Sequence, residues 1–81
     1  MIENLRKEIS ELDRQISDLL CQRLSLVEKI QTEKDRQKKP IEDLHREAEI
    51  LNLVKQGAPE KFHPAIESIY QSIFSAGKRR S

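Results

Sequence analysis

The sequence predicts an all-α protein with one long helix and two shorter helices, and three observations support this. Residues 1–39 contain neither glycine nor proline and consist mostly of good helix formers. Apolar residues recur in this segment at spacings of three and four, which is the pattern of a helix packed along one side. Every glycine and proline of the chain lies after residue 39. These glycines and prolines divide residues 40–81 into two short helical segments.

The first helix is expected over about residues 2–38. Its apolar stripe begins with Ile2, Leu5, Ile9, Leu12, Ile16 and Leu19. Pro40 ends the helix, because proline disfavours helical geometry in the preceding residue and cannot continue the hydrogen-bond ladder. At about 1.5 Å per residue the helix is roughly 55 Å long, which is more than one small globule can cover.

The second helix is expected over about residues 43–56, and the third over about 64–79. Asp43 suits a helix N-terminus, and Gly57 ends the second helix. The face of this helix carries Leu44, Glu47, Ala48, Leu51 and Val54. Pro64 suits the first position of the third helix, and Gly77 weakens its end. One side of the third helix carries Ile66, Ile69, Tyr70, Ile73 and Phe74.

Length and composition restrict the organisation and the classes of function. The 81 residues are enough for a single domain, 1–81. Only 36% of them are hydrophobic and none is Trp, so the core of one chain is thin. We therefore expect a partner chain to help bury apolar surface. The net charge of +1, with both signs interspersed, argues against nucleic-acid binding. No segment approaches the roughly 20 apolar residues that span a bilayer. The lone Cys21 and the absence of a signal segment indicate the cytoplasm.

Two cations interrupt the apolar pattern of the first helix. Arg23 lies seven residues after Ile16 and seven before Ile30, and Lys34 lies seven after Val27. Arg23 and Lys34 therefore project from nearly the same face, roughly 16 Å apart along the axis. Arg6 lies on the adjoining stripe, in seven-residue steps before Lys34.

The second helix has a matching anomaly, because Glu47 shares the stripe of Leu44 and Leu51. Asp43 lies one turn before Glu47, and Arg46 directly precedes it. Burying an isolated charge costs several kcal/mol, so these groups should be paired or should face a polar ligand such as an anion with hydroxyls. An alternative of equal weight on pattern alone is structural. Long basic side chains can reach water, and polar residues within an apolar seam can specify register and oligomeric state.

Together these residues resemble the all-α chorismate mutase family. The matching segments, in order, are Leu5-Arg6, Ile9-Ser10-Glu11-Leu12-Asp13, Leu19-Leu20, Arg23, Lys34, Pro40-Ile41-Glu42-Asp43 and Arg46-Glu47. The resemblance implies an intertwined homodimer whose two active sites each use residues of both subunits. It also implies rearrangement of chorismate to prephenate in aromatic amino-acid biosynthesis, a reaction that needs no metal and no cofactor.

The resemblance also implies a role for each ionisable residue. Arg6 would enter the partner's site, where it and Arg23 would bind substrate carboxylates, with Arg46 supporting them. Lys34 would contact the ether oxygen, and Asp43 and Glu47 would lie near the ring hydroxyl. The catalytic residues would then be Lys34, Glu47 and Arg23.

The third helix departs from the family. Relatives usually place Ser on a substrate carboxylate and Gln or Glu as a second donor to the ether oxygen. Alignment of the apolar pattern puts Gly77 and Ser81 at these two positions, which predicts weaker catalysis. The tail formed by Lys78, Arg79 and Arg80 is interpreted as a solvated chain end or as the remnant of a longer chain.

Two other functions stay open. An isochorismate pyruvate lyase on the same fold would use much the same cations. A non-catalytic helical dimer that senses a pathway metabolite is favoured by the departures in the third helix. His45 and His63 are too few and too far apart to suggest a metal site.

Overall fold

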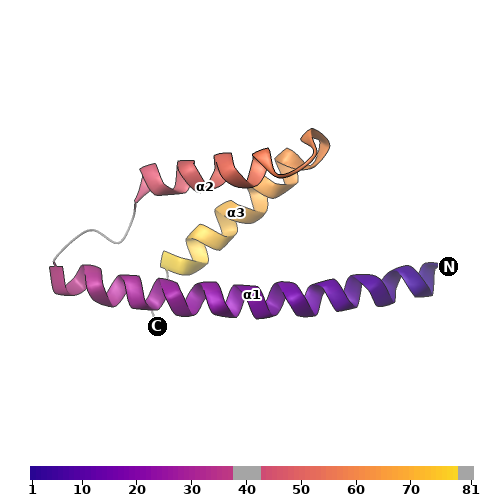
Figure 1. Cartoon of the computed structure of the whole chain (residues 1–81), viewed down its shortest axis with the longest axis horizontal. Helices are drawn as coiled ribbons and strands as arrows, with labels where there is room; N and C mark the ends of the chain where they lie inside the picture. Colours follow the sequence, from indigo (N-terminus) through magenta and orange to yellow (C-terminus); the bar gives the residue numbers. More distant parts are fainter. Residues whose placement is uncertain (38–42, 79–81) are drawn as a thin grey trace. The chain divides into compact units, whose positions relative to one another are not determined.

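The computed structural model describes residues 1–37 and 43–78, which form three α-helices and one short 3-10 helix (Figure 1). The elements are α1 (Ile2–Gln37), α2 (Leu44–Gln56), η1 (Glu60–Phe62) and α3 (His63–Lys78). These two ranges contain no strand, so the predicted all-α class is confirmed. The predicted helix limits at residues 38 and 79, and the terminating Pro40, lie outside the described residues. The chain divides into two units, 1–32 and 33–81, and each is described by itself.

Helix α1 has 36 residues and exposes much of its apolar stripe. The six side chains that begin this stripe retain between 52% and 64% of their exposure: Ile2, Leu5, Ile9, Leu12, Ile16 and Leu19. Leu26 and Ile30 are also more than half exposed. A contiguous apolar surface of this kind is typical of an interaction site.

Local chemistry defines both ends of α2. The Asp43 carboxylate accepts a hydrogen bond from the backbone N–H of Arg46, so the expected N-terminal role of Asp43 is confirmed. Gly57 is the C-cap, as expected, and its N–H donates to the carbonyl of Leu53 at 3.3 Å. The backbone φ of Gly57 is −84°, so this cap does not use the left-handed conformation that favours glycine.

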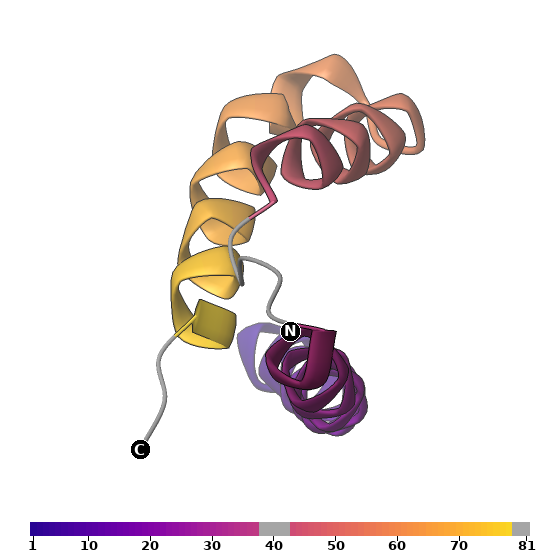
Figure 2. The ribbon, with the colours of Figure 1, turned by 90° about the vertical axis from the view of Figure 1, so that its left-hand side faces the viewer.

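A tight connection joins α2 to α3. Residues Glu60–Phe62, which lie between the second and third predicted helices, form the 3-10 turn η1, and the N–H of Phe62 donates to the carbonyl of Pro59 at 3.0 Å. The His63 ring nitrogen Nε2 lies 2.9 Å from the carbonyl oxygen of Ala58. Helix α3 begins at His63, which puts Pro64 at its second position, where the missing N–H still costs no helical hydrogen bond. Figures 1 and 2 show α3 turning back from this connection at an angle to α2.

Helices α2 and α3 are linked by two ion pairs at different distances from the connection. Near the turn, Lys55 Nζ lies 3.1 Å from Glu67 Oε1. Farther away, Lys78 Nζ lies 2.8 Å from Glu47 Oε2. The two pairs together tie the start and the end of α2 to α3.

The apolar face of α3 is only partly buried. Phe74 is 5% exposed, and its ring meets that of Tyr70 edge to face, with centroids 5.9 Å apart. Leu44 of α2 and Ile69 of α3, which the sequence assigns to apolar faces, are 66% and 57% exposed in the single chain. The described part of the chain therefore leaves most of both side chains uncovered.

Candidate functional site

The two anomalous cations of α1 lie on the less exposed stripe of that helix. Arg23 and Lys34 are half-buried, as are Leu20 and Val27. Gln31, which lies between Arg23 and Lys34 in the sequence, is only 8% exposed. Spacings of three or four residues put all five on one helical face. The burial of the polar Gln31 was not predicted from the sequence. Its position four residues after Val27 and three before Lys34 nevertheless puts it on the same stripe.

Arg6 has a different environment, because its side chain is exposed and lies on the N-terminal part of α1. Its sequence neighbour Leu5 and the next apolar residue of the stripe, Ile9, are also more than half exposed. A guanidinium beside an apolar stripe would lie at the edge of any interface that buries the stripe.

The start of α2 combines capping with candidate substrate binding. Asp43 Oδ1 accepts from the Arg46 N–H at 3.0 Å, and the Asp43 carbonyl accepts from the Glu47 N–H at 3.1 Å. The Arg46 guanidinium is exposed and lies 3.7 Å from Glu49 Oε2. Such a loose surface pair contributes little stability and leaves the arginine able to reorient toward an anion.

Glu47 is the least exposed of the candidate carboxylates. Its side chain is 18% exposed, in the first turn of α2, and its partner Lys78 is 33% exposed, in the last turn of α3. The interpretation of Lys78 as part of a solvated tail is therefore wrong, because its side chain forms an ion pair with a candidate site residue. Its place within α3 agrees with the predicted range of about 64–79. The sequence contained a signal, since Lys78 follows Tyr70 and Phe74 at four-residue steps on the same helical face.

Gly77 lies within α3 beside Lys78 and is half-buried. With no side chain, it offers only backbone groups to a ligand. Ser81, the other predicted residue of this segment, lies outside the described residues.

The structure thus brings together some of the predicted residues and places the others separately. Asp43, Arg46 and Glu47 share the first turns of α2, and Lys78 joins Glu47 from α3. Arg6 and Arg23 lie on the part of α1 that belongs to the unit 1–32, and Lys34 lies in the last turn of α1.

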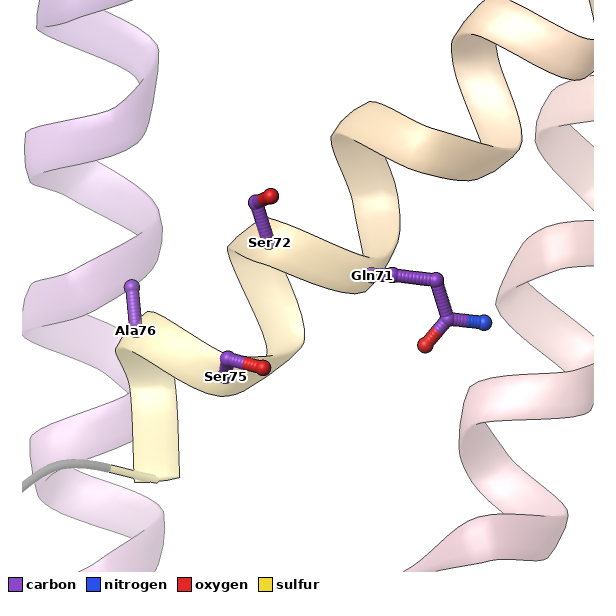
Figure 3. A pocket seen from close by; sticks show the side chains of 4 residues that line it. All are labelled: Gln71, Ser72, Ser75 and Ala76. Carbon is purple, nitrogen blue, oxygen red and sulfur yellow. The ribbon is translucent and has the colours of Figure 1, made fainter.

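In the described part of the chain, two of the surface hollows lie away from this cluster and lack the charges that a dicarboxylate needs. One, of about 370 Å³, is lined by Gln71, Ser72, Ser75 and Ala76 of α3 (Figure 3). The other, of about 440 Å³, is lined by Cys21, Gln22, Ser25 and Leu26 of α1. None of these eight lining residues is Arg or Lys, so neither hollow offers the cations that an anion site needs.

Within residues 1–37 and 43–78, His, Cys, Asp and Glu form no group of three or more that could hold a metal ion. In the same ranges, no helix combines the length and the apolar character that crossing a membrane requires.

Comparison with known proteins identifies a family. A family model described as chorismate mutase type II matches residues 5–81. No curated protein and no solved structure shows a significant match to the chain. The matched range begins one residue before Arg6 and includes all eight candidate residues.

Proposed function

Since the chain belongs to the chorismate mutase type II family, we propose that it is a chorismate mutase that rearranges chorismate to prephenate. The observation that carries this proposal is that the family match contains the two cations and the carboxylate that interrupt the apolar pattern, Arg23, Lys34 and Glu47, together with Arg6 on the adjoining stripe. One bound substrate accounts for all four. A structural role in helix pairing would explain the two cations on α1 but gives no reason for the inward Glu47.

The reaction accounts for the residue types. A carbon–oxygen bond breaks as a carbon–carbon bond forms within one molecule, so the enzyme supplies no nucleophile, redox group or metal. Its task is to hold the enolpyruvyl arm over the ring and to stabilise negative charge that develops on the ether oxygen. Arg23, with Arg6 and the support of Arg46, binds the two carboxylates, because a guanidinium matches a carboxylate with two parallel hydrogen bonds.

Lys34 has the role that affects the rate most. Its ammonium donates to the ether oxygen, where it is most useful in the transition state, because negative charge grows on that atom as the bond breaks. The Glu47 carboxylate accepts a hydrogen bond from the ring hydroxyl, with Asp43 close to the same group. Asp43 has capacity for this in addition to its cap, because a carboxylate can accept about four hydrogen bonds.

The proposed active form is an intertwined homodimer with two shared sites. The exposed apolar stripe of α1 supports this, because pairing with a second α1 would bury it. Covering half of a Leu or Ile side chain contributes on the order of 1 kcal/mol. With eight such side chains on each chain, from Ile2 to Ile30, the gain is comparable with the cost of association. Arg6 lies beside this stripe, so pairing of the two α1 helices would bring its side chain to the partner's site.

An assay with two substrates tests the proposal. Purified protein is incubated separately with chorismate and with isochorismate, substrate loss is followed by ultraviolet absorbance, and the product is identified by mass spectrometry. Prephenate from chorismate supports the mutase. Pyruvate from isochorismate, without prephenate from chorismate, would establish the lyase instead. Turnover of neither substrate would favour the non-catalytic dimer that senses a metabolite, the alternative function that Gly77 supports.

A further inference from the structure

The ion pair between Glu47 and Lys78 joins the first turn of α2 to the last turn of α3. The two residues are far apart in the sequence, yet Nζ and Oε2 lie 2.8 Å apart. Both side chains are at least two-thirds buried, so solvent screens their attraction less than that of an exposed pair. A short charge-assisted bond of this kind also restricts the rotamers of the carboxylate.

We propose that Lys78 is a positioning residue that holds the Glu47 carboxylate in the orientation needed to accept the substrate's ring hydroxyl. This inference rests on the proposed mutase function and adds to it a residue that the sequence pattern had assigned to a solvated tail. Lys78 binds Oε2, and the carboxylate retains capacity for further donors, because its two oxygens together accept about four hydrogen bonds. Lys78 therefore orients Glu47 without saturating it.

Charge gives Lys78 a second effect through the same contact. The substrate is a dicarboxylate, and a half-buried Glu47 with no nearby cation would repel it. The ammonium at 2.8 Å offsets this negative charge and keeps the field of the cluster favourable for an anion. Gly77, the preceding residue, has no side chain, so the charged side chain in the last turn of α3 is that of Lys78.

The chain contains a matched control for this pair. Lys55 and Glu67 also link α2 to α3, at 3.1 Å, and the Lys55 side chain is 30% exposed compared with 33% for Lys78. This second pair lies near the connection between the helices and involves no candidate site residue. Lys55→Gln therefore removes a comparable inter-helix link and leaves Glu47 untouched.

The test is a double-mutant cycle on kcat/KM for chorismate, using Lys78→Gln, Glu47→Gln and the double variant, with Lys55→Gln as the control. Helicity and the melting temperature are measured by circular dichroism for each protein. We expect Lys78→Gln to lower kcat/KM roughly tenfold to a hundredfold, as misplacement of a binding group does. In the Glu47→Gln background the same substitution should have little further effect. Lys55→Gln should leave kcat/KM unchanged, and Lys78→Arg should restore most of the activity.

Each other outcome overturns the inference in a recognisable way. An equal loss from Lys78→Gln with and without Glu47 would mean that Lys78 does not act through Glu47. An equal loss from Lys55→Gln would mean that any link between α2 and α3 matters, so the role is structural. An active wild-type protein that Lys78→Gln does not impair would refute the positioning role alone. An inactive wild-type protein would refute the mutase function and the positioning role with it.

Discussion

The Asp43 side chain accepts a hydrogen bond of 3.0 Å from the backbone N–H of Arg46, and this bond sets the start of α2. The same first turn presents Glu47, so the cap also positions a candidate site residue.

Removal of this cap should destabilise the protein. Asp43→Ala should lower the free energy of unfolding by about 1 kcal/mol, because a helical N–H loses its acceptor. Asp43→Asn should retain most of the stability, since the amide oxygen can still accept the bond. Urea unfolding monitored by circular dichroism compares the three proteins. Equal stability of the Ala variant and the wild type would show that the cap is not formed in solution.

Lys34 should be required for the rate and not for the fold. Lys34→Ala removes the proposed donor to the ether oxygen, and loss of one such donor lowers kcat by roughly a hundredfold to a thousandfold. Steady-state kinetics measures this, and circular dichroism should show unchanged helicity. If the variant retains full activity but changes its oligomeric state or its stability, Lys34 specifies helix pairing and does not act on the substrate.

Gly77→Ser should improve both activity and stability. The new hydroxyl supplies a hydrogen bond to a substrate carboxylate worth about 1 kcal/mol, which corresponds to roughly a fivefold rise in kcat/KM. Serine also costs a helix about 0.5 kcal/mol less than glycine. The matched control is Ala76→Ser, which adds the same hydroxyl one residue earlier at an exposed position. A rise in kcat/KM for both variants, or for neither, would argue against a substrate contact at residue 77.

Gly57→Ala should be tolerated, although Gly57 caps α2. Its φ of −84° is open to any residue, and an added Cβ would lie 3.8 Å from the carbonyl oxygens of Leu53 and Val54, which is ordinary van der Waals contact. The alanine reduces the entropy of the unfolded chain and should stabilise the protein by about 0.4–1 kcal/mol. A thermal melt checks this, and a lower melting temperature would indicate that α2 ends differently in solution.

Mixing two inactive variants tests the shared sites. In Arg6→Ala every site lacks the partner's arginine, and in Lys34→Ala every site lacks its lysine. Refolding the two together should form heterodimers in half of the molecules, each with one intact site, and restore about a quarter of wild-type activity. Sedimentation should show the dimer throughout. No recovery of activity from a verified heterodimer would mean that each site is built from one chain.

The sequence predicts those features of the fold that depend on local chemistry. The lack of Gly and Pro before residue 40 predicts α1, and Asp43 and Gly57 predict the ends of α2, because caps and helix breakers act within a few residues. The spacing of Tyr70 and Phe74 likewise predicts the apolar face of α3.

Features that depend on distant residues could not be predicted. The spacing that puts Lys78 on the face of Phe74 does not reveal Glu47 as its partner, because that contact depends on the angle between two helices. The helical spacing also does not reveal that Leu44 and Ile69 stay more than half exposed in the single chain. The proposed roles of Arg6 and Arg23 involve a second chain, so periodicity can mark these residues as unusual but cannot assign their ligand.

The rate of prephenate formation by the purified protein is the most direct test of the proposed function. Chorismate is incubated with the wild type, with Lys34→Ala and without protein, and prephenate is quantified over time by nuclear magnetic resonance. We expect formation by the wild type well above the spontaneous rate, and formation by Lys34→Ala roughly a hundredfold to a thousandfold slower than by the wild type. Prephenate formation by the wild type at no more than the spontaneous rate would contradict the assignment as a chorismate mutase.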